Sequence, residues 1–108
     1  EIELVDYDQK WINIYIKDSK DEDGDSLSIK INQDVNWDVA LKNEFETRKI
    51  KQENNMIRFH FTAINNGSSP PNTSTILFKN NKGELVKTLT LNLKESEEAL
   101  LIFKKGAN

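Results

Sequence analysis

The sequence predicts an all-β protein, an antiparallel sandwich of two sheets. Nearly every patterned segment alternates apolar and polar residues with a period of two, as half-buried strands do. These segments are short and are separated by turn-forming residues such as Gly, Asn, Asp and Ser,. No apolar pattern with the 3.6-residue period of a long helix interrupts them, which favours an all-β class over a mixed one.

The first clear strand is WINIYIK, residues 11–17, and its alternation is complete. Ile12, Ile14 and Ile16 share one face, and these side chains need a core. The opposite face carries Trp11, Asn13 and Tyr15. The role of that second face is the main functional question that the sequence raises.

Two further strands are expected after a polar loop that contains Gly24. LSIKI, residues 27–31, places its leucine and isoleucines on one face. VNWDVAL, residues 35–41, places Trp37 in a row of aliphatic side chains. Because a two-sheet sandwich holds a large aromatic side chain between its sheets, we expect Trp37 to be fully buried at the centre.

The second half of the chain continues the alternation. IRFHFTA, residues 57–63, has an apolar row and a polar row. TILF, residues 75–78, and LVKTLTLNL, residues 85–93, follow a polar loop, and Gly83 indicates a hairpin turn between them,. The last segment loses its alternation over its first three residues, so we expect a bulge there.

Three segments are less clear. Residues 42–55 carry few apolar side chains and predict a loop with one short edge strand near residues 48–52. SEEALLIFKKG, residues 96–106, fits a short helix capped by Ser96 and Gly106, and it fits a buried strand equally well,. The first five residues alternate acidic and apolar side chains, which allows the two terminal segments to pair.

The count is about seven to eight short strands, which is typical of an immunoglobulin-like antiparallel β-sandwich. A small closed barrel is the alternative. The length of 108 residues suits one domain, residues 1–108, with a modest core,.

Composition narrows the functional classes. The net charge is −3 with no basic stripe, so we expect no nucleic-acid partner. The chain has no cysteine, which excludes a disulfide scaffold and a cysteine-ligated zinc site. No apolar run approaches the roughly 18 residues of a membrane span, so we expect no membrane insertion by this segment. Because the chain begins at Glu1 rather than Met, we expect a signal, anchor or neighbouring domain upstream.

Two stretches carry a resemblance to a known family. SLSIKINQDVNWDVAL resembles the middle of a BACON domain, with a strand, an Asn-rich turn and a Trp among valines. IRFHFTAINNGSSPPNTSTILFKNNKGELVKTLTLNLKE resembles its second half. The similarity covers residues 11–95, and the chain is best described as BACON-like.

The resemblance implies an immunoglobulin-like fold and a setting in secreted or surface-anchored bacterial proteins. It implies a location in the periplasm or on the outer cell surface, through an anchor outside this segment. The expected function is that of a non-catalytic accessory module, a structural spacer or protein-interaction domain that contacts neighbouring domains of its polypeptide. The alternative is a carbohydrate-binding module for dietary glycans, host glycans or mucin.

An acidic loop is a candidate calcium site. Asp21, Asp23 and Asp25 place carboxylates at alternate positions around Gly24, and Ca²⁺ prefers such oxygen ligands. An EF-hand frame fails, because Lys30 would occupy the position of the bidentate glutamate,. The alternative is a solvated acidic turn, and we expect no cofactor.

A row of aromatic residues is a candidate glycan platform. If the first strand extends backward, Tyr7, Trp11 and Tyr15 share a face with Asn13. Flat rings stack on the C–H faces of sugars, and amides bond sugar hydroxyls. The alternatives are contact with a neighbouring domain or burial beneath the chain's own segment ALLIF, residues 99–103,. We expect this segment to cover the Trp11–Tyr15 face, at least in part.

Catalysis is not expected. His60 is the sole histidine, and a hydrolytic base needs partners. Neither G-x-S-x-G nor H-E-x-x-H occurs,. The chain is therefore interpreted as a binding or structural module and not as an enzyme.

Overall fold

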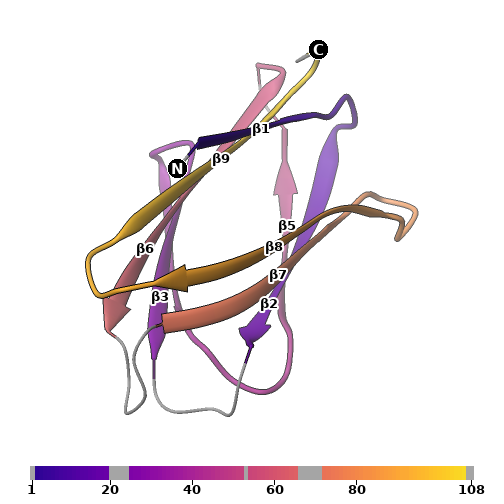
Figure 1. The fold of residues 1–108 in the computed structure, drawn as a ribbon. Coiled ribbons are helices and arrows are strands. Elements are labelled where there is room, and N and C mark those ends of the chain that lie inside the picture. Colours follow the sequence, from indigo (N-terminus) through magenta and orange to yellow (C-terminus); the bar gives the residue numbers. More distant parts are fainter. Residues whose placement is uncertain (1, 20–24, 53, 66–71, 107–108) are drawn as a thin grey trace.

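The structure is a computed structural model that describes residues 2–19, 25–52, 54–65 and 72–106. Two β-sheets form a sandwich (Figure 1). The five-stranded sheet has the order β1 (Ile2–Asp6), β9 (Glu98–Lys104), β6 (Met56–Asn65), β3 (Ser26–Ile31) and β4 (Val35–Ala40). The four-stranded sheet has the order β5 (Glu46–Lys51), β2 (Trp11–Asp18), β7 (Asn72–Lys79) and β8 (Leu85–Leu93).

The predicted fold class is confirmed. The described residues contain nine strands and no helix, in an arrangement compatible with an immunoglobulin-like sandwich. Nine strands exceed the expected seven to eight, because both terminal segments are strands. One pairing is parallel, that of β1 with β9, and the other pairings within the two sheets are antiparallel.

Aromatic side chains fill the centre of the sandwich. Phe59 from β6, Phe78 from β7 and Phe103 from β9 are fully buried. Their ring centroids lie 4.9 to 5.6 Å apart in tilted or edge-on pairs, which is the geometry that aromatic quadrupoles favour. The strand alternation supplies the aliphatic remainder of the core, which includes Ile12, Ile14, Ile16, Leu27, Ile29, Ile57, Ile76 and Leu101.

Trp37 does not occupy this centre, and the prediction of full burial was wrong. Its row on β4 does face inward, because Trp37 pairs with the buried Ile29. However, β4 is the edge strand of its sheet, and Trp37 is only half-buried. Alternation identifies the inward face of a strand, but it does not say how far that strand lies from the middle of the sheet.

The C-terminal segment forms β9, and its predicted position over Trp11 and Tyr15 was also wrong. β9 lies between β1 and β6 in the sheet opposite to β2. Its alternate residues Ala99, Leu101 and Phe103 point into the core. The pairing of the two terminal segments, which the sequence allowed, does occur. β1 runs parallel to β9, with Ile2 beside Leu100.

The expected bulge and hairpin are both present. Phe78 pairs with Lys87 while Lys79 pairs with Leu85, so Val86 is an extra residue on β8,. The turn before β8 is built around Asn80, whose side-chain oxygen accepts hydrogen bonds from the amides of Lys82 and Glu84 at 2.9 and 3.0 Å. Gly83 has a φ of 82°, a conformation that favours glycine. The short edge strand expected near residues 48–52 is β5, at Glu46–Lys51.

Candidate functional site

The outer face of the four-stranded sheet brings together three of the predicted glycan-platform residues. Because Ile12, Ile14 and Ile16 are buried, the alternate residues of β2 point away from the core. Trp11, Asn13 and Tyr15 therefore lie in one outward row, and all three are half-buried. Their shared face follows from the strand alternation, and their role as a glycan platform stays a prediction.

Lysine side chains lie over the aromatic rings of this face. The Nζ of Lys49, from β5, is 5.0 Å from the ring centroid of Trp11. The Nζ of Lys79, from β7, is 4.9 Å from that of Tyr15. The Nζ of Lys17 is 5.0 Å from the Phe45 ring. These distances are within the range of cation–π attraction.

A second aromatic contact extends the row. The rings of Tyr15 and Phe45 meet edge to face, with centroids 6.3 Å apart. Phe45 is 41% exposed although it is a large apolar residue. The surface that these contacts define is named here the lysine–aromatic face, and it comprises Trp11, Asn13, Tyr15, Lys17, Phe45, Lys49 and Lys79.

The strand register explains how distant residues meet on this face. Asn13 pairs with Lys49 on one side and with Lys79 on the other. The three residues therefore form a row across β5, β2 and β7, between the Trp11 ring and the Tyr15 ring. The Asn13 amide nitrogen donates to the backbone oxygen of Asn80 at 3.4 Å, so its side chain is held at the level of the two lysines.

Tyr7 does not belong to this face, contrary to the predicted platform. The strand does not extend backward from Trp11, because β1 ends at Asp6 and the chain then crosses to the other sheet. Tyr7 lies in this crossing and is buried at 5% exposure, with its ring 5.6 Å from that of Phe103. Its hydroxyl donates to the backbone oxygen of Trp11. Burial, with a smaller contribution from Asp8, raises the pKa of this hydroxyl,.

Of the three candidate calcium ligands, the structure describes only Asp25. Asp21 and Asp23 lie outside the described residues. Asp25 is buried, and its Oδ2 accepts a hydrogen bond from the Thr73 amide at 3.3 Å. Asp18 is also buried and accepts from the Thr73 hydroxyl at 3.4 Å. Within the described ranges, no group of three His, Cys, Asp or Glu side chains is placed to hold a metal ion.

His60 lies on the outer face of the five-stranded sheet. Its Nε2 is 3.3 Å from the Glu98 carboxylate, and both side chains are substantially exposed, at 39% and 58%. The nearby hollow is lined by Lys30, Gln33, Arg58 and Leu100 together with His60. This is the environment of an exposed polar contact at the surface, and such contacts contribute little to stability.

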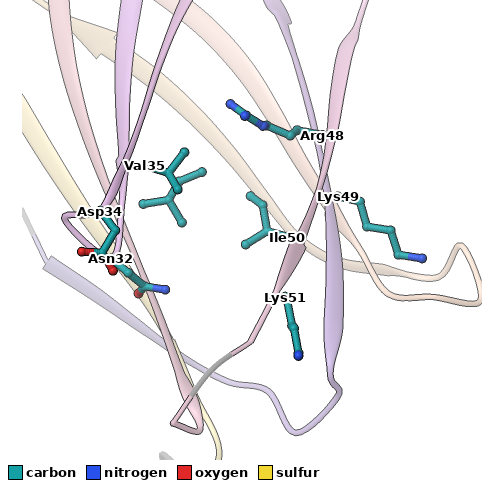
Figure 2. A pocket seen from close by; sticks show the side chains of 8 residues that line it. Asn32, Asp34, Val35, Arg48, Lys49, Ile50 and Lys51 are labelled. Atoms are coloured by element: carbon teal, nitrogen blue, oxygen red, sulfur yellow. The ribbon is translucent and has the colours of Figure 1, made fainter.

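A groove opens on the side of the sandwich where the edge strands β4 and β5 face each other. Figure 2 shows Ile50 pointing across it toward Val35, while Lys49 points to the other side of β5. The groove has a volume of about 270 Å³. At this edge the Arg48 guanidinium lies 5.3 Å from the Trp37 ring centroid, which explains how the half-buried Trp37 is covered.

The lysines are the part of the site that sequence reasoning missed. The sequence predicts a loop with one short edge strand for residues 42–55 and assigns no role to Lys49. The alternation Thr47, Lys49, Lys51 within β5 was the available signal, but its significance depends on the pairing of β5 with β2.

No family model, curated protein or solved structure matches this chain. The described part of the chain includes no helix long and apolar enough to span a membrane.

Proposed function

We propose that this chain is a non-catalytic, BACON-like accessory module of a secreted or surface-anchored bacterial protein. In this proposal it works outside the cytoplasm as a structural spacer or protein-interaction domain next to other domains of its polypeptide. The observation that carries the proposal is the pairing of β1 with β9. Both terminal strands belong to the same sheet. A mechanical force that neighbouring domains apply to either strand therefore acts directly on the folded sandwich.

The parallel direction of this pair also sets where neighbouring segments would lead. Ile2 lies beside Leu100, and Asp6 lies beside Lys104. Ile2 and Lys104 are thus held about 13 Å apart along the strand direction, from the rise of a strand. Because the strands are parallel, polypeptide before Ile2 and polypeptide after Lys104 would extend in opposite directions. That arrangement suits a module inserted between two others.

The spacer role is tested by joining the chain without added linkers between a donor and an acceptor fluorescent protein. Single-molecule energy transfer is expected to give one narrow distance distribution that salt does not change, because the terminal strands fix the attachment points. The control is a Gly/Ser linker of equal length, which has an r.m.s. end-to-end distance of about 57 Å as a random coil. A distribution as broad as that of the control would contradict the proposal.

Carbohydrate binding is the second candidate, and the lysine–aromatic face favours it. Trp11 and Tyr15 remain half-buried rather than covered by another segment, with the Asn13 amide between them. Aromatic rings offer the C–H faces of sugars an electron-rich surface, while amide and ammonium groups bond hydroxyl or carboxylate oxygens. Dietary polysaccharides and mucin-type glycans are the ligand classes to test.

A glycan array tests this candidate with the wild-type chain and two variants. The wild type is expected to bind at least one polysaccharide, and Trp11→Ala and Tyr15→Ala are each expected to weaken that binding by about tenfold or more, the equivalent of about 1.4 kcal/mol. Leu4→Ala is the matched control, because Leu4 is 53% exposed and lies on β1 in the other sheet. Binding that survives both aromatic replacements would exclude this face as the site.

A further inference from the structure

We infer that the lysine–aromatic face selects acidic polysaccharides, with a sugar carboxylate held between Lys49 and Lys79 above Asn13. This inference rests on the carbohydrate-binding candidate and specifies the chemistry of its ligand. It does not depend on the spacer role, which a binding measurement leaves untouched.

The first argument is the sign of the charge on this face. The outward positions of β2, β5 and β7 include Lys17, Lys49, Lys51 and Lys79. At the described outward positions of the four-stranded sheet there is no Asp or Glu: the carboxylates on its strands, Asp18 and Glu46, pair on the inward side with Ser74 and Ile16. The whole chain nevertheless has a net charge of −3. A cationic face on an acidic chain is complementary to an anionic ligand.

The second argument is the position of the ammonium groups. Lys49 and Lys79 lie over the rings of Trp11 and Tyr15, so a neutral sugar must displace both lysines before it can stack. A neutral sugar offers the displaced ammonium groups only hydroxyls, so the positive charges of the two lysines stay uncompensated. A carboxylate instead forms charge-assisted hydrogen bonds with the displaced ammonium groups, and such bonds are about twice as strong as neutral ones. The same two rings are then free for the sugar.

The third argument is the spacing of the row. Lys49 and Lys79 flank Asn13 on the neighbouring strands, so their Cα atoms are separated by two strand spacings, about 10 Å. Each lysine leans toward a different ring, with Lys49 over Trp11 and Lys79 over Tyr15. Trp11 and Tyr15 are four residues apart on β2, or about 13 Å. The row thus places the Cα atoms of both lysines midway between two stacking rings, with one ammonium group over each ring, which suits a polymer better than a single sugar.

The experiment compares two polymers that differ in one group. Polygalacturonate and the same polymer with its carboxyl groups chemically reduced are titrated against the full chain by calorimetry, at low and at physiological ionic strength. The acidic polymer is expected to bind about tenfold more tightly or better, with a difference that shrinks as salt screens the charges. Two other polyanions serve as controls. Polyglutamate has carboxylates but no sugar ring, and single-stranded DNA has sugar rings but no carboxylates.

Two double variants locate the effect. Lys49→Gln with Lys79→Gln is expected to reduce the affinity for polygalacturonate by about tenfold or more. Lys30→Gln with Lys104→Gln removes the same charge from exposed positions on the other sheet and is expected to leave the affinity unchanged. Circular dichroism of both variants verifies that the sandwich is retained.

Each alternative result overturns the inference in a distinct way. If the carboxyl-reduced polymer bound as tightly as polygalacturonate, the face would be a glycan site without selectivity for acidic sugars. Equal or tighter binding of polyglutamate or DNA would mean that charge alone is recognised. If neither galacturonan binds while a neutral glycan does, the carbohydrate-binding candidate stands and the acidic ligand is wrong. Loss of binding in the Lys30/Lys104 variant as well would place the ligand away from this face.

Discussion

Replacing Phe59 by Ala is expected to lower the free energy of unfolding by about 3–5 kcal/mol, the range for a fully buried phenylalanine. Phe59 has no exposed surface and contacts Phe78 and Phe103, with centroids 5.2 and 5.6 Å away. Its three-ring cluster joins the two sheets, so the cavity left behind cannot be filled by movement of one strand. Urea denaturation followed by circular dichroism measures the loss.

Trp37→Ala is the control for this prediction, because Trp37 is the larger side chain but is only half-buried at an edge. Its replacement is expected to cost about 1–2 kcal/mol, as for an ordinary partly exposed position. If Trp37→Ala destabilised the chain as much as Phe59→Ala, the centre of the core would lie at the β4 edge and the arrangement described above would be wrong.

Truncation after Glu97 is expected to abolish folding altogether. The deletion removes β9, which separates β1 from β6 and is hydrogen-bonded to both. It also removes the buried Leu101 and Phe103. The combined loss of a central strand and its core side chains exceeds the roughly 5–15 kcal/mol by which domains are stable.

Far-ultraviolet circular dichroism and the dispersion of amide proton shifts distinguish the two outcomes of this truncation. The control removes only residues 107–108 and is expected to unfold at the same urea concentration as the full chain. A shortened chain that still unfolds cooperatively would show that β9 is an appendage to a sandwich that is complete without it.

Strand alternation predicted those features that depend on neighbouring residues. The row Ile12, Ile14, Ile16 is buried as expected, and the broken alternation at the start of β8 marks the bulge at Val86. Both follow from side chains that alternate between the two faces of a strand. The face that carries Trp11, Asn13 and Tyr15 was therefore predictable, since it is the complement of the isoleucine row.

The features that failed depend on where a strand lies in its sheet. Trp37 has the sequence neighbours of a core residue, but its strand is at an edge. Tyr7 continues the spacing of Trp11, but the chain changes sheets between them. Lys49 meets Trp11 only because β5 pairs with β2. Edge position, crossing and register are set by the packing of the whole chain, and a local period does not encode them.

The pairing of β1 with β9 has a kinetic consequence. Ile2 meets Leu100, so residues 3–99 must be synthesised before the first strand finds its partner. Closing so long a loop carries a large entropic cost, and contacts between distant residues slow folding. β1 is therefore expected to remain unpaired until the residues that separate it from β9 have been synthesised. Its acidic residues Glu3 and Asp6 then have a second use, because charge on an unpaired strand discourages association with other chains.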